Sequence, residues 1–339
     1  MLRNVQISMF LLVAAVLVLP WSTAMGDPLP GRDILKFQQL PMIATTIIDP
    51  GSPIGDTNVY FGHDELSTAW AIPGAEGHYQ GIAMADDFAD TFDTPVVHVK
   101  WWGSYLNEKE NPDGFMRARK FLISFETDVP VDPTGNFSHP GEPLLSQVVT
   151  LGPLAPMSGT FTETSIRPPD PILGESLFEY NAELHCPFPQ EPDTVYWLKI
   201  VALDDNPDTA NRLEWGWHNR DFTIFDPLAS PAIVPGETDI GPLPTGEPVW
   251  HFQDDAVSSN VAVWQPTNPD EPCNWGVDQV NYVPQHYLPG IDHPDYGTGV
   301  PQYSKDLAFE LFTVPEPSMF TLIGLGLIGL LGCGRRRTH

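Results

Sequence analysis

Acidic side chains are the residues of this chain whose spacing could support catalysis. Three adjacent aspartate pairs recur, at Asp86-Asp87, Asp204-Asp205 and Asp254-Asp255. A glycosidase needs two carboxyl groups about 5–10 Å apart, one on each side of a sugar bond. Neighbouring residues of a strand point to opposite faces, so a pair such as Asp86-Asp87 cannot itself form that couple. We therefore expect no catalytic residue and no enzymatic activity, and a secreted glycoside hydrolase is the least favoured alternative.

A second acidic segment could bind a metal ion. Asp204, Asp205 and Asp208 bring oxygen ligands together in a loop that follows an apolar strand. Calcium takes about six to eight oxygen ligands from such loops. The spacing does not match an EF-hand, and such side chains also accept hydrogen bonds from their own backbone in turns. We favour the turn and commit to no cofactor, with calcium at these three residues as the weak alternative.

Ten tryptophans could stack against sugar rings. Trp215 and Trp217 lie two residues apart and so share one face of an extended segment, whereas Trp101 and Trp102 point to opposite faces. A flat platform of Trp102, Trp215 or Trp217 would suit a carbohydrate-binding module of the β-sandwich type. A large β domain also needs such residues in its core, which is the interpretation that we favour.

The segments that must position these residues read as β-strands. The chain has 37 prolines among 339 residues, and only 18% of its residues are charged. Prolines interrupt almost every helical period. Phe178, Tyr180, Ala182 and Leu184 alternate with polar residues, as in a strand with one solvated face, and residues 195–203 are almost wholly apolar, as in a central strand. The pattern predicts an all-β fold, an antiparallel β-sandwich or jelly-roll-like domain.

The domain organisation follows from composition. Residues 25–57 are rich in Pro, Asp and Gly and form a leading segment that could add an edge strand. The β-sandwich ectodomain spans residues 58–314 and carries a Pro/Gly-rich insertion at 227–248. Two domains divided near Pro168–Pro171 are the alternative. The formal charge of -28 argues against nucleic acid and against an anionic membrane surface as partners.

Residues 1–24 form the pattern of a secretory signal peptide. Arg3 supplies the positive start, Ile7 to Leu19 is apolar except for Ser8, and small residues precede Met25. We expect signal peptidase to cut between Ala24 and Met25, so that the protein is exported.

The C-terminal segment, residues 315–339, has three parts in order. Pro315-Glu316-Pro317 comes first, an uncharged run from Met319 to Gly334 follows, and Arg335, Arg336 and Arg337 come last. A helix over the uncharged run is short for a bilayer but can insert with local thinning. The arginines stay in the cytoplasm, which places the ectodomain outside. We expect a short transmembrane helix that holds the protein before processing.

This tail resembles the PEP-CTERM sorting signal of bacteria that make extracellular polysaccharide. The resemblance covers residues 314–337. It implies recognition by an exosortase, a membrane cysteine protease that would cut near Pro315-Glu316-Pro317 and pass the protein to the cell surface or beyond. The protein is then the substrate of that protease. An association with envelope or biofilm polysaccharide is the corresponding expectation for a partner.

Six segments between residues 58 and 262 look like an uncharacterised secreted β-sandwich domain common in PEP-CTERM proteins. They are Ala85–Phe88, Val99–Tyr105, Phe121–Val129, Tyr196–Leu198, Trp215–Trp217 and Asp254–Ala256. That domain carries no known activity, so the resemblance transfers no catalytic residue. Taken together, we expect an exported structural or adhesive surface protein, with a carbohydrate-binding module as the alternative.

Two further expectations concern the ectodomain. Cys333 lies in the tail, which leaves Cys186 and Cys273 as an even number of cysteines in an oxidising compartment, and we expect them to pair. Leu307 to Val314 carries bulky apolar groups on both faces, so it should be a strand paired inside the sheet that ends at Pro315.

Overall fold

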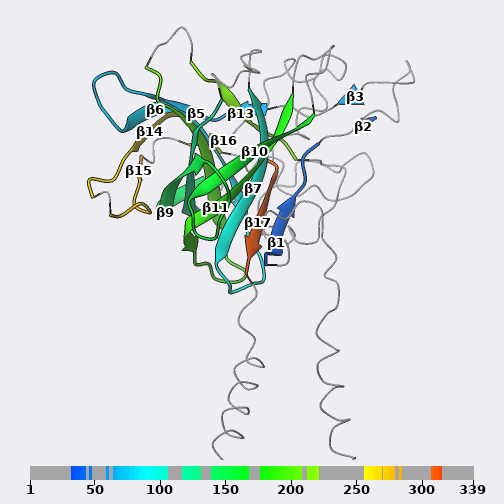
Figure 1. Cartoon of the computed structure of the whole chain (residues 1–339). Coiled ribbons are helices and arrows are strands. Elements are labelled where there is room, and N and C mark those ends of the chain that lie inside the picture. The colour runs from blue at the N-terminus through cyan, green and yellow to red at the C-terminus, as the bar shows by residue number, and fades with distance from the viewer. Residues whose placement is uncertain are drawn as a thin grey trace, which may run out of the picture.

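A computed structural model describes residues 32–42, 46–47, 59–60, 64–105, 117–130, 139–167, 176–207, 212–220, 256–268, 270–278, 282–284 and 307–314 (Figure 1). Seventeen strands and no helix occur among these residues. The strands are β1 (Ile34–Gln39), β2 (Thr46–Ile47), β3 (Val59–Tyr60), β4 (Asp64–Leu66), β5 (Thr68–Ala71), β6 (His78–Phe88), β7 (Val96–Tyr105), β8 (Lys120–Val129), β9 (His139–Leu151), β10 (Thr160–Arg167), β11 (Leu177–Phe188), β12 (Tyr196–Asp204), β13 (Trp215–His218), β14 (Ala256–Trp264), β15 (Gly276–Val277), β16 (Val283–Pro284) and β17 (Phe309–Thr313).

Fifteen of these strands form one large sheet. Its main path runs β1-β17-β7-β11-β10-β9-β8-β12-β5-β6-β14-β15, with β4, β13 and β16 joined at its sides, while β2 and β3 pair separately. The sheet is mixed, because β9 pairs with β10 and β5 pairs with β12 in parallel. The prediction of a wholly antiparallel sheet is therefore wrong at these two joints. At the first joint, the backbone between β9 and β10 turns through left-handed conformations at Met157 and Gly159 instead of closing a hairpin.

The two halves of this sheet face each other across one apolar core. Ring centroids of Trp101 on β7 and Phe121 on β8 lie 5.1 Å apart, and those of Phe125 on β8 and Phe188 on β11 lie 4.3 Å apart. Burial of each such side chain contributes about 1.5–3 kcal/mol. Alternation along each strand sends every second side chain into this core, so the remaining ones line the two outer faces.

We give names to those outer faces. The tail face is the outer side of β1, β17, β7 and β11, and the disulfide face is the outer side of β9, β8, β12, β6 and β14. The disulfide face carries its own apolar cluster, which includes Leu122, Val201 and Val261. Trp275, from the loop between β14 and β15, packs against that cluster.

The sheet includes strands from both ends of the ectodomain. β1 lies within the expected leading segment, so the folded domain starts before residue 58. β17 pairs with β1 on one side and β7 on the other, which is the paired last strand that the apolar groups on both of its faces predicted. Phe161 and Tyr180 lie on either side of Pro168–Pro171, so the described strands before and after that segment share one core.

Several predicted segments lie outside the described residues. They are the signal peptide with its cleavage site at Ala24 and Met25, the insertion at 227–248, the pair Asp254-Asp255, and the sorting and anchor segment at 315–339. In the described part of the chain, no helix is long and apolar enough to cross a membrane.

Candidate functional site

The three candidate platform tryptophans are buried. Trp215 and Trp217 have no exposed surface and Trp102 has 3%. The Trp215 indole donates to the Tyr180 hydroxyl at 3.1 Å, and the Trp217 indole donates to the Ala308 carbonyl at 2.9 Å. The Trp102 ring lies under Lys100, whose Nζ is 5.1 Å from the ring centroid. A stacking platform needs exposed rings, so this hypothesis is corrected: these residues pack the protein and satisfy its buried hydrogen bonds.

The acidic loop after β12 is a hydrogen-bonded turn. Asp204 accepts from the amides of Asn206 at 2.9 Å and Leu213 at 3.0 Å. Asp205 accepts from the Tyr79 hydroxyl at 2.6 Å and pairs with Lys120 at 2.7 Å. Protein donors thus occupy the oxygens that the calcium alternative would use. Asp208 lies outside the described residues.

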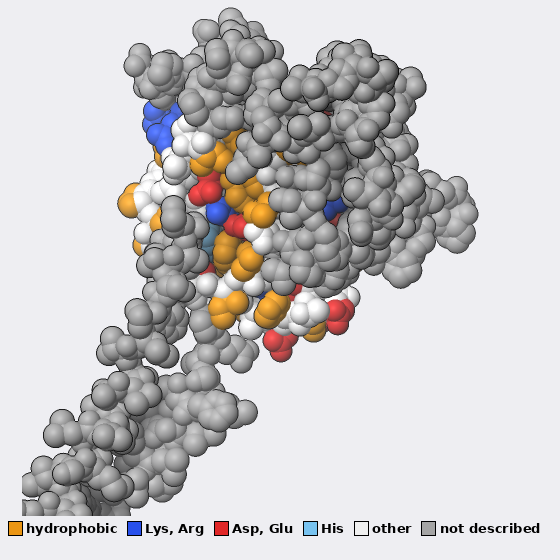
Figure 2. Space-filling model, turned by 90° about the vertical axis from the view of Figure 1, so that its right-hand side faces the viewer, with side chains coloured by type: hydrophobic (Ala, Val, Ile, Leu, Met, Phe, Trp, Pro, Cys, Tyr) orange, Lys and Arg blue, Asp and Glu red, His pale blue; other side chains and the backbone are white. Residues whose placement is uncertain are grey.

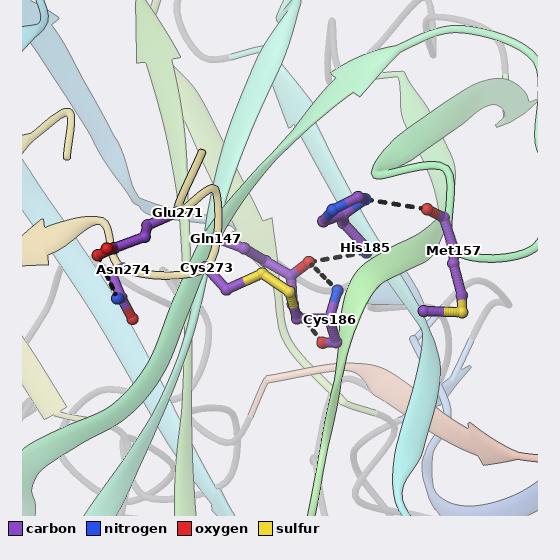
Figure 3. Close-up of a disulfide and its surroundings, with 7 residues drawn as sticks. All are labelled: Gln147, Met157, His185, Cys186, Glu271, Cys273 and Asn274. Atoms are coloured by element: carbon purple, nitrogen blue, oxygen red, sulfur yellow. Dashed lines mark hydrogen bonds between the residues drawn. A yellow bond between two sulfur atoms is a disulfide. The ribbon is translucent and has the colours of Figure 1, made fainter. Parts of the chain in front are cut away.

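Cys186 and Cys273 form a disulfide in the structure, with their Cα atoms 6.2 Å apart and a separation of 87 positions in sequence (Figure 3). The Gln147 side chain braces the bond, because its Oε1 accepts from the amides of His185 and Cys186 and its Nε2 donates to the Cys186 carbonyl. The bridge therefore ties the loop after β14 directly to β11, and Gln147 joins β9 to the same place.

The first strand of the sheet begins beside the point where the last strand ends. Ile34 of β1 pairs with Thr313 of β17, so the chain before β1 and the chain after β17 leave from the same edge (Figure 1). Four charged or titratable residues gather beside this pair on the tail face. We call Arg32, Asp33, His98 and Glu183 the tail-proximal cluster.

This cluster is an ion network with little exposure. Arg32 donates to Asp33 at 2.5 Å and to Glu183 at 2.6 Å, and His98 Nδ1 lies 3.2 Å from Asp33 Oδ2. The His98 ring stacks on Phe312 of β17, with centroids 4.6 Å apart. Arg32 thus joins the chain just before β1 to β11, and His98 contacts the final strand.

The electrostatics of the cluster depend on its burial. Burial favours protonation of Asp33, but hydrogen bonds from His98 and Arg32 outweigh it and lower the pKa of that carboxyl. Burial raises the pKa of Glu183 in spite of Arg32. Ligand atoms of Asp33, His98 and Glu183 lie within 4.8 Å of one another, close enough to hold a metal ion. The Arg32 guanidinium already donates to both carboxylates, so a metal ion here would compete with it for their oxygens.

A second charged network continues along the tail face. Lys100 lies 3.2 Å from Glu310 and 3.3 Å from Glu179, and Gln38 donates to Glu310 at 2.8 Å. Figure 2 shows the side of the molecule on which β1 and β17 lie, where acidic and basic side chains sit among hydrophobic ones. Charged residues at alternate positions of β7, at His98 and Lys100, were the sequence signal for this network. Its partners on β1 and β17 are remote in sequence, so the signal alone could not identify them.

Asp86, one of the flagged acids, anchors the start of the last strand. It is fully buried, and its Oδ2 accepts from the Leu307 amide at 2.8 Å. Burial raises the pKa of Asp86 to about 7, although the donated hydrogen bond and the charge of Arg220 act against this. The residue is therefore a structural acceptor for the chain that enters β17.

Sequence comparisons agree with this division of the chain. Residues 35–311 match a domain of unknown function, DUF7901, and residues 313–337 match the PEP-CTERM protein-sorting motif. No curated protein and no solved structure matches the chain. The domain match starts within β1 and ends within β17, so the unit that the family defines is the sheet described above. The chain therefore belongs to the DUF7901 family and carries a PEP-CTERM sorting motif at its C-terminal end.

Proposed function

We propose that this protein is a non-catalytic structural or adhesive domain that stands on the outer surface of the cell. The PEP-CTERM motif implies an exported protein that an exosortase sorts. The observation that carries the rest of the proposal is the place of β17. This strand is paired on both sides, and the sorting motif begins at its last residue, Thr313.

The distance between sheet and motif determines how the domain is displayed. Only Val314 separates β17 from Pro315, so the domain has almost no tether. Before processing, the β1–β17 end of the sheet would face the membrane and the opposite end would face outward. A rigid sheet close to its attachment point favours a load-bearing or adhesive role.

The arrangement of the titratable groups supports a role without catalysis. The acids and bases of the tail face pair with one another across strands. Asp86 and Asp204 accept backbone hydrogen bonds. Catalysis needs such groups directed toward a substrate, whereas these hold strands and turns together. The association with envelope or biofilm polysaccharide that we propose here rests on the sorting motif.

Sorting is tested by variants of the tail in a host that carries an exosortase. Glu316→Ala and deletion of Arg335 to Arg337 should each leave the protein uncut and in the membrane fraction. Glu271→Ala removes an exposed acid elsewhere and is the matched control. Immunoblots of cell fractions and intact-mass spectrometry provide the readout. Normal cutting and release of both tail variants would overturn the proposal.

A further inference from the structure

A pocket opens on the disulfide face at the end of the β8–β9 hairpin. Its volume is about 450 Å³, and its lining includes Thr127, His139, Gly141, Glu142 and Tyr282. Pockets for small ligands commonly measure about 300–1,000 Å³. The pocket lies away from the tail-proximal cluster, which is built on β7, β11 and the chain just before β1.

Irregular pairing of the two strands creates the space. The register between β8 and β9 shifts at Phe125/Glu126 and again at Glu126/Asp128. Such bulges redirect side chains and occur often beside functional sites. Gly141 fits this place because a Cβ atom there would lie 2.4 Å from the Thr127 hydroxyl oxygen. The hydroxyl instead accepts from the Glu142 amide at 2.8 Å.

Tyr282 is held in a fixed position on one wall. Its hydroxyl donates to Glu126 at 3.3 Å, and Lys199 Nζ lies 5.0 Å from its ring centroid. Lys199 and Glu126 are both fully buried and lie 2.5 Å apart. Burial and the neighbouring Glu126 raise the pKa of Tyr282 well above its usual value, so the ring stays neutral. Tyr282 itself remains partly exposed.

The charges around the pocket limit the chemical class of ligand. Glu142 is exposed in the lining, and Lys199, which contacts the Tyr282 ring, is already paired with Glu126. An anionic ligand would be repelled. The lining suits a lipid poorly, since it sets carboxylate, hydroxyl and imidazole groups beside the Tyr282 ring, Val129 and Pro140. A ligand with many hydroxyl donors and an apolar ring face suits this combination.

We propose that this pocket binds a neutral saccharide, with Tyr282 as the aromatic wall and Glu142 and His139 as hydrogen-bonding groups. The site differs from the buried tryptophans and from the tail-proximal cluster. The inference does not rest on the proposed sorting, since a secreted or a membrane-held protein would present the same pocket. Loss of sorting and loss of sugar binding are therefore separate results.

The test is calorimetric titration of the exported protein with neutral hexasaccharides of glucose, xylose and mannose, and with an oligogalacturonate as the acidic probe. We expect at least one neutral probe to bind more tightly than the acidic one. Tyr282→Ala should weaken that binding about tenfold, the larger end of an aromatic contact. Trp264→Ala changes another exposed aromatic residue, outside the pocket, and should leave binding unchanged.

Two further variants keep the test informative if Tyr282→Ala fails to fold. Tyr282→Phe keeps the ring and loses the bond to Glu126, so binding should persist. Glu142→Gln changes an exposed side chain. It should weaken the binding of neutral saccharides by about threefold to tenfold, the value of one lost hydrogen bond. No binding of any neutral probe at about 10 mM, a concentration well above a millimolar Kd, would overturn the proposal. So would preference for the acidic probe, or wild-type affinity in both Tyr282→Ala and Glu142→Gln.

Discussion

The two outer faces of the sheet are stabilised in different ways. The tail face joins remote parts of the chain through ion pairs, such as Arg32 with Glu183 and Lys100 with Glu310. The tail face has only a small apolar cluster, around Trp102 and Leu177. The disulfide face carries a larger apolar cluster, one buried ion pair and the Cys186–Cys273 bond. The comparison indicates that ion pairs can hold the terminal strands of a β domain in place. An internal loop of the same domain is held by a covalent bond.

The largest effect should come from removing the strand that the tail face holds. A chain that ends at Pro301 lacks β17, whereas a chain that ends at Val314 keeps it. Phe309 and Leu311 are fully buried and contribute about 1.5–3 kcal/mol each, a large share of a typical stability of about 5–15 kcal/mol. Thermal melting of both should show a cooperative transition only for the longer chain. Equal melting would show that the segment is a linker.

Loss of the disulfide should have the next largest effect. Changing both Cys186 and Cys273 to Ser removes the bond that closes a loop of 87 residues. The chain-entropy account gives a loss of about 4–5 kcal/mol for such a loop. Urea unfolding measures the loss, and non-reducing peptide mass spectrometry of the wild type should show the two cysteines linked. Two free thiols in the exported protein, or unchanged stability, would contradict this account of the disulfide face.

The buried pair on the disulfide face sharpens the comparison with exposed pairs. Lys199→Met leaves Glu126 buried without its cation and should cost about 3–5 kcal/mol. The double variant Lys199→Met with Glu126→Leu should recover much of the lost free energy of unfolding. The matched control is Lys120→Met, since Lys120 and Asp205 form an exposed pair worth about 0–1 kcal/mol. Equal losses for Lys199→Met and Lys120→Met in urea unfolding would contradict the prediction.

Asp86 gives the domain a dependence on pH. Its pKa is about 7 in the fold and 3.8 ordinarily, so the folded protein binds this proton more tightly than the unfolded chain. The stability that this group contributes is fully present below about pH 4 and is lost as the pH rises through 7. The total loss in the free energy of unfolding is up to about 4 kcal/mol. Unfolding free energies should therefore rise as the pH falls from 8 to 5.

The slope of that rise identifies the group. Asp86→Asn should flatten the pH dependence between 5 and 8. Glu271→Gln should not, because hydrogen bonds from Asn274 and Asn268 lower the pKa of Glu271 and place its titration below this range. If the pH dependence of stability is unchanged in Asp86→Asn, it arises from other buried acids. Glu163 and Glu310 are examples, since burial also raises their pKa values.

Local patterns predicted the strands better than the site. Alternation of apolar and polar residues identified β11, and bulky apolar groups on both faces identified β17. The cysteine count indicated the disulfide. The parallel joint between β9 and β10 depends on a loop conformation that leaves no periodic signal. The tail-proximal cluster forms because β1 pairs with β17, a contact across most of the chain, so residue types alone could not assemble it.

The central claim is that β17 belongs to the sheet up to the first residue of the sorting motif. Native-state hydrogen exchange of the exported protein, read by mass spectrometry over residues 307–314, tests it most directly. The account predicts that these amides are protected as strongly as those of β7 and β12, because β17 is hydrogen-bonded on both sides. Exchange as fast as that of an unstructured peptide, with β7 still protected, would contradict it.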